Sequence, residues 1–255
     1  MKKINQILLL FIISFLLWGC QTTKQKIYTD SGVNYKDTDW NATFFQSHRF
    51  PSRDSVQWVK EGDNNFLRFR LKDKDKGYAS TDRIVTRRAP YMERAEVTQR
   101  IGLKTKSKYQ IKFSARFVQG FENDKGEVFF QIHQENKICK IGPILKLQFN
   151  RGRLVLHVIN ANNSKFTHKE YFATKYLSQL KDKWNKFKVV YDAEKKIISL
   201  YLNDNFLIRN INHAENSCAT PYLKFGIYRK GNKDEPNKLS VVDFDKFQIT
   251  EIKTK

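Results

Sequence analysis

The sequence predicts an all-β protein built from two packed antiparallel sheets, closed as a sandwich or as a barrel. Ten short segments rich in β-branched and aromatic residues follow one another along the chain, with turn residues between them. Several of these segments alternate apolar and polar residues, which is the pattern of a strand with one face in a core. No part of the chain after its first twenty residues has the sustained spacing of an amphipathic helix.

The ten predicted strands follow in chain order. They are Asn65–Leu71, Arg94–Ile101, Tyr109–Val118, Val128–Gln134, Ile144–Phe149, Leu154–Ile159, Phe187–Tyr191, Ile197–Leu202, Tyr222–Tyr228 and Val241–Ile249. Arg151-Gly152 and Asn203-Asp204-Asn205 are typical of tight hairpin turns. Only Phe172–Leu180 has some helical spacing, so we expect one or two helical turns in a loop there.

Large aromatic residues are expected to fill the space between the sheets. Aromatic side chains bury much apolar surface, so we expect this group in the core rather than as platforms for sugar rings. The residues concerned are Trp58, Trp184, Phe187 and Phe206.

The N-terminus reads as an export signal. Lys2 and Lys3 precede an apolar run from Ile7 to Leu17, and Leu17-Trp18-Gly19-Cys20 follows. Cysteine after Leu-x-Gly is the bacterial lipoprotein signal, so Cys20 is predicted to be lipidated and to become the first mature residue. A plain signal peptide and an uncleaved anchor are the alternatives.

The chain therefore divides into three parts. Residues 1–19 are the predicted lipoprotein signal peptide, residues 20–38 a polar tether, and residues 39–255 a single domain large enough for one core. Gln21 rather than aspartate after the cysteine favours the outer membrane if the cell has two membranes. We thus expect a protein that is lipid-anchored in a bacterial cell envelope.

The chain is strongly basic. Its formal net charge is +21, and loss of Lys2 and Lys3 with the signal peptide leaves +19. Such a field concentrates polyanions and speeds their encounter. Outside the cytoplasm these include acidic polysaccharides, lipopolysaccharide and nucleic acid. The alternative is a lysine-rich composition whose charges are simply solvated.

Two cysteines remain once Cys20 is lipidated. An oxidising compartment permits a disulfide between Cys139 and Cys218. Two buried thiols are the other interpretation, and the sequence leaves both open.

Three of the strand-like segments carry reactive side chains opposite their apolar face. They are Arg94-Ala95-Glu96-Val97, Gln131-Ile132-His133 and Tyr222-Leu223-Lys224-Phe225-Gly226-Ile227-Tyr228. In the third segment, alternation sends Leu223, Phe225 and Ile227 into a core, while Tyr222, Lys224 and Tyr228 emerge together on the other face. In the strand of the second segment, Val128, Phe130 and Ile132 lie on one face, and Phe129, Gln131 and His133 lie on the opposite face. This set suits acid–base chemistry on an anionic substrate.

The ordered motifs resemble polysaccharide lyases of the heparin-lyase-I and glucuronan-lyase type, and are also similar to family 7 alginate lyases. The resemblance covers about residues 40–250. Besides the three segments above, it rests on Gly142-Pro143-Ile144-Leu145-Lys146-Leu147, Arg151-Gly152-Arg153-Leu154, Trp184, Asn203-Asp204-Asn205 and Arg229. It implies a β-jelly-roll sandwich of two antiparallel sheets, like concanavalin A, and cleavage of a uronate-containing polysaccharide by β-elimination.

The chemistry of such a lyase explains the residue types. Removal of the C5 proton next to a carboxylate builds negative charge, which Arg94 and Gln131 are suited to stabilise. His133 can act as the base and Tyr228 as the acid, or Tyr228 can serve as both. Lys224 favours the ionised tyrosine and binds substrate, and Glu96 orients Arg94.

The remaining substrate-binding candidates are Tyr222 and Arg229, beside Lys224 and Glu96. The expected partners are an anionic polysaccharide and the membrane, through the lipid on Cys20, with no nucleic acid and a monomeric chain. The candidate substrates are alginate, glucuronan and heparin-like chains.

Several alternatives stay open at this point. Taken one at a time, the candidate residues can be ordinary surface pairs, and a non-catalytic binding module for acidic polysaccharide would use the same fold. Glu122-Asn123-Asp124-Lys125-Gly126-Glu127 matches a glycoside-hydrolase motif of paired carboxylates, but Asn, Lys and Gly between them favour a turn. His48, His157, His168 and His213 lack reactive neighbours in sequence and are interpreted as structural or surface residues.

No cofactor is expected. The sequence has no closely spaced His/Cys set and no Asp-rich calcium loop. Because some heparin-lyase relatives bind calcium, Asp243 and Asp245 are kept as weak candidates.

Overall fold

The structure is a computed structural model. It describes residues 45–47, 54–76, 82, 91–99, 102–134, 142–162, 165–214, 220–232 and 234–252, with residues 45–47 and 160–168 as backbone only. The lipidation candidate Cys20, the pair Cys139 and Cys218, and His48 lie outside the described residues.

Strands dominate the described ranges, as the alternating sequence predicts. They are β1 (Phe45–Ser47), β2 (Val56–Glu61), β3 (Asn64–Leu71), β4 (Met92–Gln99), β5 (Lys108–Gln119), β6 (Glu127–Gln134), β7 (Gly142–Asn150), β8 (Arg153–Asn162), β9 (Lys165–Tyr176), β10 (Asn185–Asp192), β11 (Ile197–Leu202), β12 (Asn205–Asn212), β13 (Tyr222–Lys230) and β14 (Ser240–Ile252). One short helix, α2 (Leu177–Leu180), lies between β9 and β10. No helix in the described ranges is both long and apolar enough to cross a membrane.

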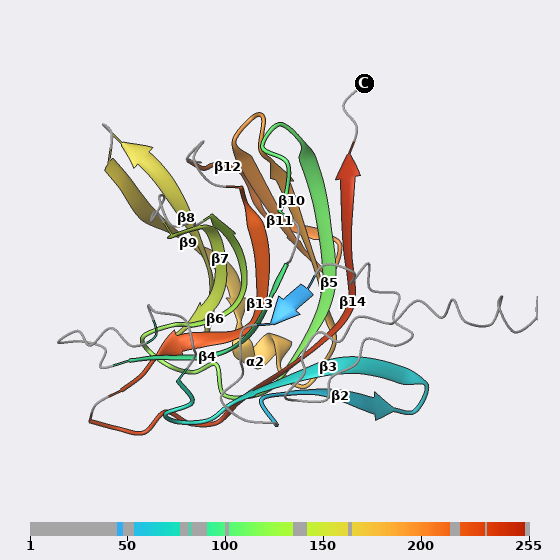
Figure 1. Ribbon diagram of the computed structural model, residues 1–255, viewed down its shortest axis with the longest axis vertical. Helices are drawn as coiled ribbons and strands as arrows, with labels where there is room; N and C mark the ends of the chain where they lie inside the picture. The colour runs from blue at the N-terminus through green and yellow to red at the C-terminus, as the bar shows by residue number, and fades with distance from the viewer. Residues whose placement is uncertain are drawn as a thin grey trace, which may run out of the picture.

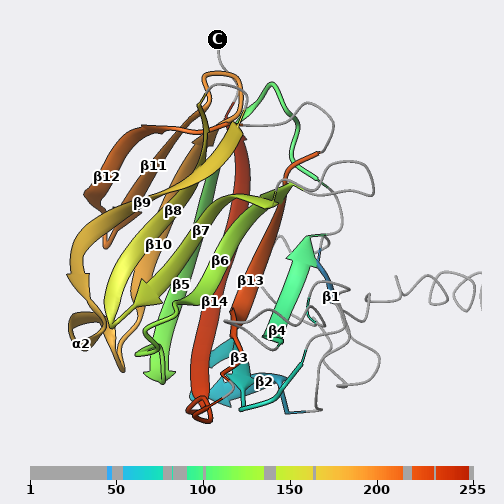
Figure 2. The ribbon, with the colours of Figure 1, turned by 90° about the vertical axis from the view of Figure 1, so that its left-hand side faces the viewer.

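The strands form two seven-stranded antiparallel sheets packed face to face (Figures 1 and 2). The first sheet has the order β1-β4-β13-β6-β7-β8-β9, and the second has the order β12-β11-β10-β5-β14-β3-β2. In Figure 2 the first sheet faces the viewer. The predicted two-sheet jelly-roll sandwich is confirmed.

The ten predicted strands are all present, and the structure adds β1, β2, β9 and β12. The helical prediction for Phe172–Leu180 was wrong over its first half, because β9 continues to Tyr176 before the single helical turn of α2. The two hairpin turns occur as expected. Arg151 and Gly152 have φ values of 50° and 69°, and Asn203 and Asp204 have 49° and 65°, which is the left-handed pair that a tight hairpin requires.

A stack of phenylalanines joins the two sheets. Phe113 of β5 lies 5.0 Å from Phe130 of β6 and 5.2 Å from Phe187 of β10, measured between ring centroids. The predicted core position of Phe187 is therefore confirmed. Trp58 is only partly buried against the core, and Trp184 packs edge-on against Phe66. Phe206 was predicted wrongly, because 45% of it is exposed on the outer face of the second sheet.

A bulge interrupts the alternation expected in β6. Phe225 and Tyr228 of β13 pair with Phe130 and Val128, so that two β13 residues face the single residue Phe129. On the other side of β6, Val128 and Phe130 pair with the adjacent residues Gln148 and Leu147 of β7, so that Phe129 is the extra residue of β6 there. Phe129 consequently enters the core, where its ring lies 5.0 Å from that of Phe117. The predicted outward position of Phe129 was therefore wrong, whereas Gln131 stays opposite the core residues Phe130 and Ile132.

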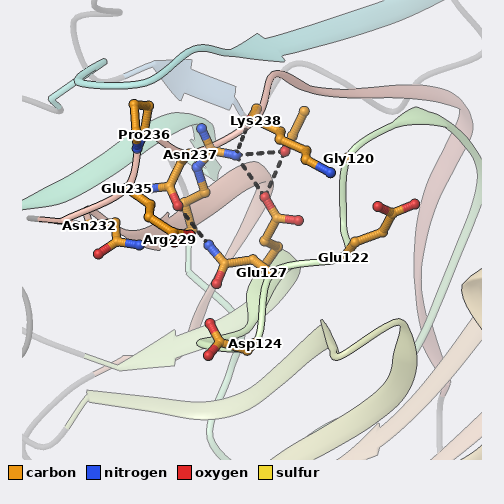
Figure 3. A pocket seen from close by; sticks show the side chains of 12 residues that line it. Gly120, Glu122, Asp124, Glu127, Arg229, Asn232, Glu235, Pro236, Asn237 and Lys238 are labelled. Carbon is orange, nitrogen blue, oxygen red and sulfur yellow. Dashed lines mark hydrogen bonds and ion pairs between the residues drawn. The ribbon is translucent and has the colours of Figure 1, made fainter.

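Arg229 occupies the interior of the sandwich and not its outer face. Its Nε donates to Glu93 at 2.5 Å, and its Nη1 donates to Glu127 at 2.8 Å and to the hydroxyl of Ser240 at 2.7 Å. Figure 3 shows Arg229 and Glu127 among the residues that line a cavity, which has a volume of about 180 Å³. The assignment of Arg229 to substrate binding was wrong, because Tyr228 faces outward and the next residue of a strand faces inward.

Arg229→Met is expected to destabilise the fold by about 3–5 kcal/mol, because it leaves the carboxylates of Glu93 and Glu127 buried without their cation. Urea unfolding followed by tryptophan fluorescence measures this loss. Lys230→Met is the matched control, since Lys230 is the exposed neighbour on β13 and its loss should change stability by less than about 0.5 kcal/mol. Equal stability of the two variants would contradict a structural role for Arg229.

Candidate active site

Three neighbouring strands of the first sheet bring the predicted reactive residues together. β13 lies between β4 and β6. Tyr228 pairs with Arg94 of β4, while Lys224 and Tyr222 pair with Gln131 and His133 of β6. All six side chains leave the sheet on the face opposite the core, as alternation predicts.

Glu96 links two of these residues. Nη1 of Arg94 donates to Oε2 of Glu96 at 2.5 Å, and Nε2 of Gln131 donates to Oε1 of the same carboxylate at 2.6 Å. All three side chains are buried. A single carboxylate therefore fixes the orientation of an arginine and an amide on strands that are not adjacent.

Gly226 makes this contact across β13 possible. It pairs with Glu96, and its φ of 135° belongs to the bulge that a side chain would strain. A Cβ on Gly226 would lie 2.2 Å from the carbonyl oxygen of Ala95. Because glycine has no side chain, nothing from β13 stands between Lys224 and Tyr228 on the outer face, and Glu96 reaches Gln131.

Asp82 is a site residue that the sequence did not reveal. Both its carboxylate oxygens accept from Arg94, with the shortest distance 2.8 Å from Nη2. Burial alone would lower the pKa of Arg94, but the negative charges of Glu96 and Asp82 outweigh burial and raise that pKa. Arg94 is thus held as a permanent cation between two carboxylates.

Tyr228 lies over this cation. The guanidinium carbon of Arg94 is 4.3 Å from the centroid of the Tyr228 ring, within the range of a cation–π contact. Tyr228 remains half-buried, whereas Arg94 beneath it is buried. A positive charge at this place stabilises negative charge that develops on the phenolic oxygen.

His133 and Lys224 flank Tyr222. The rings of His133 and Tyr222 are tilted with centroids 5.3 Å apart, and Nζ of Lys224 lies 5.6 Å from the Tyr222 ring. His133 and Lys224 are 7% and 6% exposed, although both point away from the core. The site thus combines an imidazole, a phenol, two cations and an amide in a largely desolvated setting, where electrostatic interactions are strong.

The polar row continues beyond the predicted residues. Gln131 pairs with Lys146 of β7, Lys146 with His157 of β8, and His157 with Glu170 of β9. Nε2 of His157 forms a short hydrogen bond with Glu170. Burial, followed by the charge of Lys230, lowers the pKa of Lys146 to about 8, and burial and Lys146 lower the pKa of His157.

Lys146 and His157 are therefore part of the reactive face, although the sequence analysis did not select Lys146 and interpreted His157 as structural or surface. The alternation of the sequence could have identified both residues. Lys146 lies between the core residues Leu145 and Leu147, and His157 lies between the core residues Leu156 and Val158, so both side chains point to the outer face. His213 is buried against the ring of Tyr191 at 5.2 Å, in agreement with a structural role.

The other sequence candidates lie elsewhere. Asp243 accepts from Arg68 and Arg116, so two guanidinium groups occupy the carboxylate that was a weak calcium candidate. Asp245 accepts from the backbone N–H of Lys246. Within the described ranges, no group of three or more His, Cys, Asp or Glu residues could hold a metal ion.

The hydrolase-like motif forms a turn, as its composition indicates. The N–H of Gly126 donates to the carbonyl of Asn123 at 3.3 Å, and Gly126 has a φ of 83°. Glu127 is bound to Arg229 inside the sandwich. The motif therefore does not present a pair of carboxylates on one strand face.

Solved structures with this fold include several that act on sugar polymers. An endo-β-1,4-glucuronan lyase from the fungus Trichoderma reesei is 13% identical, with a TM-score of 0.62 over 83% of this chain and 93% of that one. Alginate lyase PA1167 from Pseudomonas aeruginosa is 13% identical, with a TM-score of 0.56 over 78% and 86%. A family 7 alginate lyase bound to its substrate GGMG is 13% identical, with a TM-score of 0.54 over 78% and 82%.

These structures place the chain among sandwich proteins of the jelly-roll type. A comparison with curated proteins gives no match. The sequence model of the polysaccharide lyase family matches residues 33–240, which is most of the chain. The protein belongs to the polysaccharide lyase family and is an enzyme of that class.

Proposed function

We propose that the enzyme cleaves a uronate-containing polysaccharide by β-elimination at the face formed by β4, β13 and β6. The observation that carries this proposal is the placement of Arg94, Gln131, His133, Lys224 and Tyr228 on three adjacent strands. Each of these residue types has a task in removing a proton next to a carboxylate and expelling a sugar oxygen.

Arg94 and Gln131 stabilise the charge that builds on the substrate carboxylate. Arginine has five N–H donors, and the contacts to Asp82 and Glu96 use Nε, one donor of Nη1 and one of Nη2. One donor each on Nη1 and Nη2 remains for a substrate carboxylate, and Gln131 keeps its second amide N–H. Because Glu96 fixes both groups, they are oriented before the substrate arrives, which is how such stabilisation becomes effective.

The proton transfers fall to His133 and Tyr228. In one route His133 takes the C5 proton and Tyr228 donates a proton to the leaving oxygen as the C4–O4 bond breaks. In the other route Tyr228 does both, and His133 helps to neutralise the carboxylate. Of the structures compared above, the family 7 alginate lyase bound to GGMG carries a histidine-to-asparagine and a tyrosine-to-phenylalanine substitution. That pairing supports the choice of a histidine and a tyrosine here.

A panel of polyuronates tests the proposal. Alginate, glucuronan, heparin, heparan sulfate and pectate are each incubated with the protein and followed by absorbance of the unsaturated product. Elimination on at least one polymer is expected, and it should persist in EDTA, because every step above uses side chains. Binding without new absorbance on any polymer would instead support a non-catalytic module.

Tyr228→Phe is expected to lower kcat by a factor of about 10²–10⁴ with little change in KM, because it removes one hydroxyl and keeps the ring on Arg94. Steady-state kinetics on the polymer identified by the panel measures this, with circular dichroism as the check on folding. Full activity of a folded Tyr228→Phe variant would remove the proposed mechanism.

His133→Ala separates the two routes. If His133 is the base, kcat should fall about as far as in Tyr228→Phe. If Tyr228 is both base and acid, the loss should be milder and partly recovered at lower pH.

Lys146 is expected to bind a substrate carboxylate beside Gln131. With a pKa of about 8 in the free enzyme, its charge is present below that pH and is lost above it, so binding of an anionic polymer should weaken as pH rises through 8. Lys146→Met should raise KM about fivefold at pH 7, the worth of one partly exposed ion pair. Lys146→Arg should move the alkaline loss of kcat/KM to higher pH.

Lys60→Met is the matched control for Lys146, because Lys60 is an exposed lysine on β2 of the second sheet. An unchanged KM in Lys146→Met, or an equal rise in the control, would show that Lys146 makes no specific contact.

We also propose that the enzyme is held in the cell envelope by a lipid on Cys20. The support is the run of apolar residues before Leu17-Trp18-Gly19-Cys20 and the polar stretch after it. Metabolic labelling with a radioactive fatty acid should mark the wild type and leave Cys20→Ser unlabelled. Equal labelling of both would refute the anchor.

A further inference from the structure

The outer face of the second sheet carries a basic hollow bordered by aromatic rings. The hollow has a volume of about 370 Å³ and lies on β5, β10 and β14. Four lysines line it, with Asp204 as the only acidic residue: Lys112, Lys186, Lys188 and Lys246. Figure 1 shows these strands in the sheet opposite the one that carries Tyr228.

The lysines are available to a ligand. Lys112, Lys186 and Lys246 are exposed and Lys188 is half-buried. Within the described part of the chain, no carboxylate forms an ion pair with any of the four. Like charges gathered at one hollow repel one another, so an anion that enters it is stabilised by all of them.

An aromatic pair extends the hollow along the same row. Phe206 of β12 pairs with Tyr201 of β11, Tyr201 with Lys188, and Lys188 with Lys112. The rings of Tyr201 and Phe206 lie 4.0 Å apart between centroids. Nζ of Lys188 is 3.7 Å from the Tyr201 centroid, and the guanidinium carbon of Arg209 is 3.8 Å from the Phe206 centroid.

This arrangement leaves an exposed apolar surface next to positive charge. Phe206 is one of only four exposed large hydrophobic side chains among the described residues. Cation–π contacts hold both rings in place before any ligand binds, which reduces the entropy lost on binding. The faces of the two rings are covered by each other and by the two cations, so the C–H face of a pyranose ring can pack against their exposed edges while its carboxylate meets the lysines.

We infer that this hollow is a second, non-catalytic binding site for an acidic polysaccharide, separate from the proposed active site. A polymer running along the row would cross β12, β11, β10 and β5, with sugar rings against the edges of Phe206 and Tyr201 and uronate groups at Lys188 and Lys112. Since the two sites lie on opposite sheets, a chain bound here leaves the β4, β13 and β6 face free. The inference rests on the acidic substrate class proposed above but not on the elimination chemistry.

The test compares two triple variants of the whole protein that lose the same charge. Lys112→Ser/Lys186→Ser/Lys246→Ser, the hollow variant, removes three of the four lysines that line the hollow. Lys60→Ser/Lys106→Ser/Lys195→Ser removes three exposed lysines that do not line it. Affinity electrophoresis in gels that contain alginate, glucuronan or heparin measures binding. For the gels every protein also carries Tyr228→Phe, so that the polymer is not cleaved during the run. Without that substitution, cleavage of an oligomer of the same uronate, three sugars long, reports on the active site.

The hollow variant should bind the polymer about tenfold more weakly than the wild type, while the charge-matched control changes by less than about twofold. Phe206→Ser alone should weaken binding measurably. Cleavage of the three-sugar oligomer should be unchanged in all of them. Equal weakening in the two triple variants, or no weakening in either, would overturn the inference.

The same variants identify the class of ligand. Single-stranded DNA and vesicles of phosphatidylglycerol are titrated alongside the polyuronates. Tighter binding of either one than of every polyuronate, lost in the hollow variant, would overturn the assignment to polysaccharide. If no polymer is cleaved but the hollow variant still loses binding, the inference stands and the proposed elimination fails.

Discussion

The arrangement of the reactive face depends on the carboxylate of Glu96. Its two oxygens hold Arg94 and Gln131, which lie on either side of β13, and the absence of a side chain at Gly226 leaves the path between them clear. The contact between Glu96 and Arg94 also offsets the cost of burying a positive charge. A buried guanidinium is costly unless it is compensated, and Glu96 and Asp82 provide that compensation. The positive charge of Arg94 therefore remains in the protein.

The face of the sheet on which each site residue lies could be predicted from the alternation of apolar and polar residues in the sequence. It places Arg94, Gln131, Lys224 and Tyr228 on the outer face, and the structure agrees. It also fails where a bulge changes the count of residues, as at Phe129, and it was not applied to Arg229, which the same rule assigns to the interior. Alternation does not predict contacts between segments that are distant in the sequence. Asp82 reaches Arg94 from outside any strand, and nothing in the local pattern of residues around it indicates that contact.

The fold was more predictable than the site because periodicity reports burial directly, while pairing between strands does not appear in the sequence. The row that joins Gln131 to Lys146 and His157 exists only once β6, β7 and β8 are in register. The position of Phe206 also depends on strand pairing that the sequence does not reveal. Its size suggested the core, but β12 is the edge strand of its sheet and offers little cover. Aromatic residues on an edge strand are therefore better judged by what lies beside them than by their hydrophobicity.

The alternation of β13 at Tyr228 and Arg229 limits how this enzyme could acquire a different substrate preference. Tyr228 and Arg229 are consecutive, yet one serves the outer face and the other neutralises two carboxylates inside. Insertion or deletion of one residue between Gly226 and Tyr228 would exchange them, so that a phenol would face the buried carboxylates and a guanidinium would replace the phenol on the outer face. The segment of β13 that holds Tyr228 and Arg229 is consequently closed to changes of length. New specificity has to come from single substitutions on the outer face or from the connections between strands.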